Sequence, residues 1–332
     1  MNIQFALRMK MISKWFKKRV LYFKRAVHKL VKMFFKRRKT TSTISSIERR
    51  IGIYFILPCF LFLLVFLAYP LFRTIYLSFY NYNPIQSLEK TFAGIDNYKW
   101  LINDPSFLNS LYITILFTVL SVILETIFGL LIAVILGKLR EGGIIKRIAS
   151  IVLLGIFIIP WAIPGISAAV SWRLLYHPQF GPINFLLGKS ILWLSNSHLA
   201  LFSIIIADVW KCTPFFIIIL FAAVICIPKE QIEAAHTDGA TNWQEFRYIV
   251  LPSILPVMLV AFIFRAIDAF TKIFDLVYML TSGGPGKATE VLPLLIFKTA
   301  LKYFRFGTAS ALSVVAILIS LVFGIWLLRK NR

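Results

Sequence analysis

Six long apolar stretches constrain the fold of this sequence more than any other feature. A helix needs about 20 apolar residues to cross the roughly 30 Å hydrocarbon core of a bilayer. Stretches of that length occupy residues 51–72, 108–136, 148–175, 199–227, 251–280 and 309–328. The chain of 332 residues is also 59% hydrophobic, so it cannot cover itself with the polar coat of a soluble globule. We therefore expect an all-α integral membrane protein with six transmembrane helices.

Prolines interrupt the third and fifth of these stretches. Pro160 and Pro164 lie in "IPWAIPG", and Pro256 lies in the fifth stretch. Proline removes a backbone donor and clashes with the preceding turn, so we expect kinked or broken helices at these points. Broken helices are tolerated in a membrane where neighbouring protein or cavity water satisfies the freed carbonyl groups. These interruptions favour a transport pathway over a simple anchor.

Basic residues indicate how the spans are oriented. Residues 1–50 contain 16 lysines and arginines but one acidic residue, Glu48, and further basic residues occupy the loop 137–147 and the end 329–332. Loops rich in Lys and Arg stay on the cytoplasmic side. With six spans, we predict that both termini and the loop 228–250 are cytoplasmic, in a bacterial-type plasma membrane.

The N-terminal extension 1–50 carries a helical pattern of its own. Its apolar residues recur at spacings of three and four with basic residues between them, which predicts an amphipathic helix on the anionic membrane surface. The alternative is a solvated arm. Nucleic-acid binding is not expected, because no base-reading motif accompanies the charge. The apolar positions are Met9, Ile12, Phe16, Val20, Phe23, Val27, Leu30 and Phe34.

The polar segment 228–250 has start and stop signals for short helices. Pro228 suits a first helical position, Glu233 lies near that helix's beginning, and Gly239 comes where it would end. Thr241 and Gln244 have the spacing of a capping box. We predict two short helices across the cytoplasmic mouth, serving either as a docking element or as a plain loop.

The same segment resembles a family signature. The pattern E-A-A, three residues, G, nine residues, I-x-L-P is similar to that of permease subunits of binding-protein-dependent ABC importers. Four further stretches resemble the carbohydrate branch, the maltose/glycerol-phosphate type: "IPWAIPGISAAVSWRLLYHPQFGPIN", "ADVWKCTPF", "FRAIDAFTKIFDLVYMLTSGGPG" and "FRFGTASALSVV". Together they extend the resemblance over most of residues 51–328. The signature and its neighbourhood comprise Glu233, Ala234, Ala235, Asp238, Gly239, Ile249, Leu251 and Pro252.

The resemblance implies a type I ABC importer permease fold with a cytoplasmic coupling helix. Glu233 would make a polar contact with an ATP-hydrolysing subunit, Ala234 and Ala235 would allow close packing, and Gly239 would form the turn. A simple helix cap is the alternative role of Gly239. The implied partners are a second permease subunit in a heterodimer, a dimer of cytoplasmic ATP-binding subunits and an extracellular solute-binding protein.

The implied function is import of a carbohydrate, in particular an oligosaccharide, by alternating access. The sequence contains no G-x-x-x-x-G-K-[ST] phosphate loop. We therefore expect no catalytic site and no bound cofactor in this chain, with ATP and Mg²⁺ used by the partner ATPase. The alternatives are a membrane-embedded enzyme acting on lipid-linked sugar, with the acids of the fifth span as its site, and a secondary transporter.

Ionisable residues at membrane depth are candidates for the substrate pathway, because they are rarely placed there without a role. Asp268, Lys272 and Asp275 are spaced to share one face of the fifth span, with Arg265 just before them. Their alternative role, like that of Glu125 in the second span, is a charge cluster that locks helices together or gates the path. Aromatic faces also bind sugars. The remaining candidates are Trp161, Trp172, Asp208, Trp210, Lys211 and Tyr278.

Three smaller features complete the expectations. The glycine-rich "TSGGPGKATE" loop, residues 281–290, is either a contact for the external binding protein or a plain turn. Cysteines 59, 212 and 226 lie in apolar stretches and are interpreted as small hydrophobic residues. Histidines 177, 198 and 236 have no carboxylate or cysteine partner at ligand spacing, so no metal site is expected.

Overall fold

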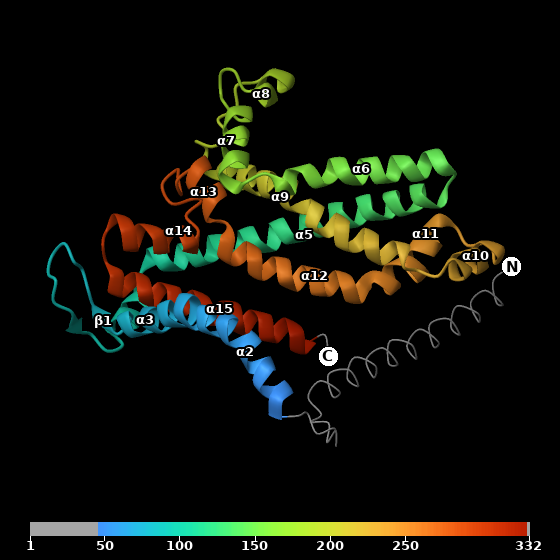
Figure 1. Ribbon diagram of the computed structural model, residues 1–332. Coiled ribbons are helices and arrows are strands. Elements are labelled where there is room, and N and C mark those ends of the chain that lie inside the picture. Colours follow the sequence, from blue (N-terminus) through green and yellow to red (C-terminus); the bar gives the residue numbers. More distant parts are fainter. Residues whose placement is uncertain (1–45, 331–332) are drawn as a thin grey trace. The chain divides into compact units, whose positions relative to one another are not determined.

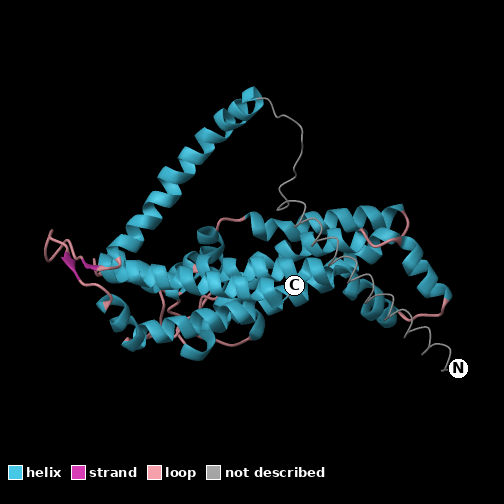
Figure 2. Cartoon of the chain, turned by 90° about the horizontal axis from the view of Figure 1, so that it is seen from below, coloured by secondary structure: helices cyan, strands magenta, loops and turns pink. Residues whose placement is uncertain are grey.

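The computed structural model describes residues 46–330, and the predicted amphipathic helix of the N-terminal extension lies outside them. The chain divides into two compact units, residues 1–70 with 329–332 and residues 71–328. Figure 2 shows that the described chain is helical except for its loops and one small hairpin.

The first unit contains the start of the first span. Its described residues include α2 (Ser46–Leu63), which contains Pro58, the π-helix η1 (Leu64–Ala68) and the beginning of α3 (Tyr69–Leu77). Neither η1 nor α3 contains a buried residue. The most apolar window within Tyr54–Leu77 likewise contains no buried residue.

Four long helices form the centre of the second unit: α5 (Pro105–Glu141), α6 (Ile144–Ala162), α9 (Ser197–Ile225) and α12 (Leu251–Lys272). They lie side by side, α5 in teal, α6 in green, α9 in yellow and α12 in orange (Figure 1). Asp104 begins α5 by accepting hydrogen bonds from the backbone N–H groups of Ser106 and Phe107. Helices α5 and α9 approach so closely at Gly129 that a β-carbon there would lie 2.3 Å from Cβ of Phe216.

Short elements connect and cover these helices. Strand β1 (Tyr80–Asn81) pairs antiparallel with β2 (Thr91–Phe92), and Tyr80 lies opposite Phe92. Helix α10 lies in the loop between α9 and α12, at the end of the bundle away from α13 and α14 (Figure 1). Helix α7 packs against α13. The remaining elements are α4 (Asp96–Asn103), α7 (Gly165–Leu175), α8 (Pro182–Leu187), α10 (Lys229–Thr237), α11 (Asn242–Glu245), η2 (Phe246–Val250), α13 (Phe274–Leu280), α14 (Leu292–Phe297), η3 (Lys298–Lys302) and α15 (Phe306–Lys330).

Six described helices have the length and apolar composition of membrane spans, as the sequence predicted. The predicted interruption of the third span is confirmed, because α6 ends at Ala162 and α7 begins at Gly165 after Pro164. The fifth span differs: α12 continues through Pro256 and ends at Lys272, and α13 begins after Ile273. The six candidate spans are Tyr54–Leu77, Pro105–Glu141, Ile144–Ala162, Ser197–Ile225, Asn242–Lys272 and Phe306–Ile325.

Candidate functional site

Helix α10 and the turn after it form the first part of the candidate site. The helix starts after Pro228, one residue later than predicted, and Asp238 caps its end. Gly239 follows with φ +77°, in the left-handed region that glycine adopts at low cost. Its N–H donates to O of His236 at 3.0 Å, and the N–H of Ala240 donates to O of Ala235 at 2.9 Å. These two bonds form a Schellman motif, so the predicted turn at Gly239 is confirmed.

The second predicted short helix starts where the sequence placed it but does not end as a separate element. In the predicted capping box, Thr241 N–H donates to Gln244 Oε1 at 2.8 Å, and Gln244 N–H donates to Thr241 Oγ1 at 3.3 Å. From Asn242 the chain continues through α11 and η2 directly into α12. In the π-turn of η2, Leu251 N–H donates to Phe246 O, and the helix continues through Pro252. The second short helix is therefore the first part of the fifth span.

The signature residues divide into two groups by burial. Glu233, Ala234, Asp238 and Gly239 are exposed, Ala235 is half-buried, and α10 contains no buried residue. The second group, Ile249, Leu251 and Pro252, is half-buried at the start of the fifth span, where Ile249 packs against a small core of Ile227, Val250 and Ile254. The first group offers an open surface, and the second attaches it to the bundle.

A buried carboxylate lies beside this loop. The side chain of Glu245 is 5% exposed, and its Oε2 lies 3.2 Å from Nε2 of His236. Its Oε1 lies 3.8 Å from Nζ of Lys138, which also donates to Asn242 Oδ1 at 3.0 Å. His236 thus has a carboxylate partner that the sequence analysis missed, because Glu245 lies beyond the turn and Lys138 lies in another span.

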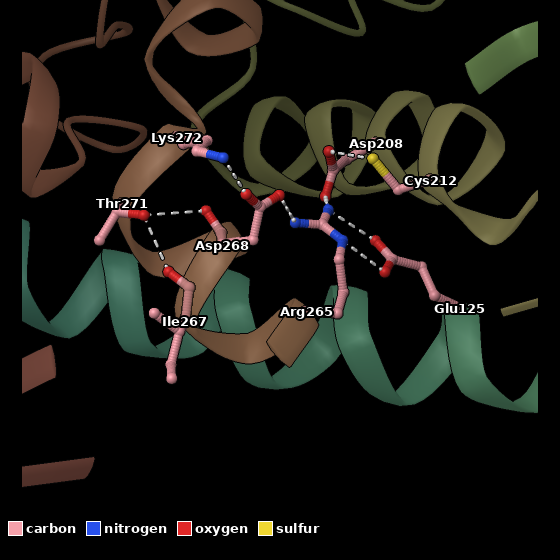
Figure 3. Close-up of polar contacts among 8 residues, drawn as sticks. All are labelled: Glu125, Asp208, Cys212, Arg265, Ile267, Asp268, Thr271 and Lys272. Atoms are coloured by element: carbon pink, nitrogen blue, oxygen red, sulfur yellow. Dashed lines mark hydrogen bonds and ion pairs between the residues drawn. The ribbon is translucent and has the colours of Figure 1, made fainter. Parts of the chain in front are cut away.

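The Arg265 cluster, defined as Glu125, Asp208, Arg265, Asp268 and Lys272, forms the second part of the candidate site (Figure 3). The Arg265 guanidinium donates from Nε and Nη2 to the two Glu125 oxygens, each at 2.9 Å. Nη2 also donates to Asp208 Oδ2 at 2.7 Å, and Nη1 to Asp268 Oδ2 at 3.3 Å. One guanidinium therefore joins α5, α9 and α12 away from water, with charge-assisted bonds.

The cluster extends from the interior to the surface. Lys272, whose side chain is 76% exposed, donates to Asp268 Oδ1 at 2.7 Å, whereas Glu125 and Arg265 are buried. Asp275 does not share this face, contrary to the predicted spacing. The helix ends at Lys272 and restarts as α13, so Asp275 lies instead beside Gly165 at the start of α7.

The cluster also changes the interpretation of Asp208. We expected it to be a candidate for the substrate pathway, but the residue is 3% exposed and its carboxylate is bonded to Arg265. Ligand atoms of Glu125, Asp208 and Cys212 lie within 4.8 Å of one another, a grouping that a metal ion could use. The Arg265 guanidinium already binds both carboxylates. The side chain of Arg265 therefore takes the place that a metal ion would occupy. Cys212 contributes Sγ 3.6 Å from Asp208 Oδ1, so it is more than an apolar filler.

The other pathway candidates do not gather in one cavity. Lys211 donates from Nζ to O of Ile163 at 2.9 Å, which satisfies a carbonyl group freed at the break between α6 and α7. Trp172 and Trp210 lie edge to face with ring centroids 5.8 Å apart. Tyr278 stacks on Phe274, and Trp161 is exposed. A cavity of about 610 Å³ between α12, α14 and α15 is lined mainly by apolar residues, with Thr271, Ser313 and Ser320, and by none of these candidates.

The glycine-rich loop 281–290 has an ordered structure. Thr281 Oγ1 and Thr289 Oγ1 lie 2.7 Å apart, and Thr289 Oγ1 donates to O of Gly284 at 2.8 Å. Asn109 Nδ2 donates to O of Lys287 at 3.0 Å, and Lys287 Nζ bonds to Ser106 Oγ. The loop is thereby attached to the beginning of α5.

The family described as "binding-protein-dependent transport system inner membrane component" matches residues 126–329, which include α10, the Schellman turn and every member of the Arg265 cluster except Glu125. The chain belongs to this family. The permease is 37% identical over 300 residues to the trehalose/maltose transport system permease protein MalF of Thermococcus litoralis, covering 88% of this chain and 97% of that one. It is 30% identical over 278 residues to the sulfoquinovosyl glycerol transport system permease protein SmoG of Agrobacterium fabrum, covering 82% and 88%.

A solved structure supports the same fold for the permease. The crystal structure of a bacterial ABC transporter involved in import of the acidic polysaccharide alginate contains a chain that superposes with a TM-score of 0.72. Sequence identity is 22%, and the match covers 86% of this chain and 96% of that one. The permease therefore has the type I ABC importer fold that the resemblance implied.

Proposed function

We propose that this permease is the transmembrane subunit of an ATP-driven importer that moves a carbohydrate into the cytoplasm by alternating access. An external solute-binding protein delivers the carbohydrate, and a second permease subunit completes the translocation path. Two cytoplasmic ATPase subunits bind ATP and Mg²⁺. The termini and the α10 loop lie on the cytoplasmic side, as the distribution of basic residues favours.

The exposed surface of α10 supports the coupling role most directly. Helix α10 contains no buried residue and contacts the core through the half-buried Ile232, yet the Schellman bonds at Gly239 define how it ends. The exposed Glu233 and Ala234 offer a carboxylate beside a shallow surface that another protein can approach. Nucleotide binding shifts the permease between states by favouring one docked arrangement of this helix over another.

The basic residues near the pathway favour a neutral saccharide. Lys211 binds a carbonyl group, Arg265 binds three carboxylates, and Lys272 binds Asp268. With three acids and two bases, the Arg265 cluster carries a formal charge of −1 when all its groups are ionised. An acidic saccharide would have to displace one of these partners, whereas a neutral one such as trehalose or maltose would not. The named relatives transport both kinds.

The alternative of an enzyme acting on lipid-linked sugar loses its proposed site. Two acids of the fifth span were its candidates, and Asp268 binds Arg265 and Lys272 while Asp275 lies apart from it. Each oxygen of the Asp268 carboxylate already binds a cation of the chain. The geometry thus favours a structural role for Asp268.

Reconstitution tests the proposal. The permease, its partner permease and its ATPase subunits are placed in proteoliposomes with the binding protein, and uptake of radiolabelled trehalose and maltose is measured. Gly239→Asp should abolish uptake while leaving the permease in the membrane, because φ +77° disfavours a side chain at the turn. Gly143→Asp is the matched control, since a β-carbon there meets nothing within 4 Å and its φ is −59°.

Uptake by Gly239→Asp at the wild-type rate and abundance would contradict the coupling role. Uptake that continues without ATP, driven by an ion gradient, would support a secondary transporter instead.

A further inference from the structure

Helix α10 has few contacts that fix its direction. Its only packing against the small core of Ile227, Val250 and Ile254 comes from Ile232, which is half-buried. The Schellman turn defines where the helix ends. The helix itself is joined to α9 and to α11 only by the backbone on each side of it. A helix held in this way can pivot unless a lateral contact prevents it.

Glu245 supplies that lateral contact. Its carboxylate is buried at the start of the fifth span, and its two oxygens face side chains from two other elements, His236 in the last turn of α10 and Lys138 near the end of α5. Lys138 also donates to Asn242, one turn before Glu245. One side chain therefore links the loop helix to the ends of two spans.

Burial of this carboxylate is informative because burial of an unpaired charge is unfavourable. The partners are half-exposed, and ion pairs of that kind add little to stability. These contacts instead fix the direction of α10, because the 3.2 Å contact between His236 Nε2 and Glu245 Oε2 restricts how far the helix can rotate. The carboxylate can accept a hydrogen bond from a neutral imidazole that carries its proton on Nε2 or from an imidazolium, so the contact does not depend on the charge of the ring.

We propose that Glu245 is a positioning residue that sets the direction of α10 relative to the ends of α5 and α12. It holds the exposed face of α10 ready for the ATPase subunit. The second half of this inference rests on the proposed function, whereas the first half does not.

Spin-label distances test the first half in the assembled complex without nucleotide. Cys59, Cys212 and Cys226 are replaced by serine, and labels are attached at Glu230→Cys on α10 and Glu141→Cys at the end of α5, both exposed positions. We expect one narrow distance maximum in this parent and loss of that maximum in Glu245→Ala. Glu89→Ala, an exposed acid in the β1–β2 loop, should leave the maximum unchanged.

His236→Ala provides a variant that is independent of the buried site, because the imidazole is half-exposed. It should lose the maximum as Glu245→Ala does, and the double variant should be no broader than either single variant, because all three lack the same contact. A narrow maximum that survives in His236→Ala, or in an assembled Glu245→Ala complex, would overturn the proposal.

Uptake per ATP hydrolysed tests the second half with the same variants. We expect a loss of about fivefold or more, the lower end of energetic coupling between sites. An unchanged ratio beside a broadened distance would show that α10 direction does not matter for coupling. Failure of the proposed function is recognised separately, because the wild-type complex would then show no ATP-dependent uptake while the distance result stands.

Discussion

Replacing Arg265 by methionine removes the guanidinium that binds two buried carboxylates, Glu125 and Asp208. Glu125 loses the donors to both its oxygens, and Asp208 loses its 2.7 Å bond, whereas Asp268 keeps Lys272. Removing one partner of a buried ion pair destabilises a protein by about 3–5 kcal/mol. At about 2–4 °C per kcal/mol for domains of 150–250 residues, Arg265→Met should lower the melting temperature by roughly 6–20 °C.

The assay heats a fluorescent fusion of the permease in detergent and measures by size-exclusion chromatography how much folded protein remains at each temperature. The matched control is a triple variant, Glu125→Leu, Asp208→Leu and Arg265→Met, which removes the carboxylates together with the cation. Apolar replacement of a whole buried ion pair is often neutral or stabilising, so the triple variant should melt well above the single one. Yield in the membrane reports the same difference if the single variant does not accumulate. A single variant that melts with the wild type, or a triple variant that melts below the single one, would refute the reasoning.

Two further predictions concern helix packing and the broken third span. Gly129→Ala should lower the melting temperature, because its β-carbon would lie 2.3 Å from Cβ of Phe216 and overpacking costs about 1–3 kcal/mol. The control is Gly155→Ala, where a β-carbon meets nothing within 4 Å, and this variant should melt like the wild type. Equal melting of these two variants would contradict the close approach of α5 and α9. Lys211→Met should destabilise the permease by about 1.5–3 kcal/mol through loss of the bond to Ile163 O. Lys189→Met, at an exposed position, should leave the melting temperature unchanged. A Lys211→Met variant that melts like the wild type would show that this carbonyl group finds another donor.

Local sequence signals predicted the elements that depend on local physics. Hydropathy located six spans, the spacing of Thr241 and Gln244 located a capping box, and Gly239 marked the turn after α10. Each of these signals lies within one segment of the chain. The second short helix was misjudged because the capping box marks its start but no local signal shows that α11 and η2 run directly into α12.

Long-range pairings account for what the sequence could not provide. Glu125 and Arg265 are 140 residues apart, and Lys138 and Asn242 are 104 apart, so no spacing rule joins them. The misplacement of Asp275 has a different origin. Helical spacing assumes a continuous helix, and the break at Ile273 has no proline or glycine to announce it.

The Arg265 cluster limits the routes by which this sequence can change during evolution. Loss of Arg265 first would strand two buried acids, and loss of Glu125 or Asp208 first would leave the guanidinium short of an acceptor in an apolar surrounding. Asp268 is the exception, because it is the most exposed acid of the group and has Lys272 as a second cation. Substitutions that remove this cluster are therefore easiest at Asp268 and Lys272, its most exposed members. The buried residues Glu125, Asp208 and Arg265 would then have to be replaced almost together.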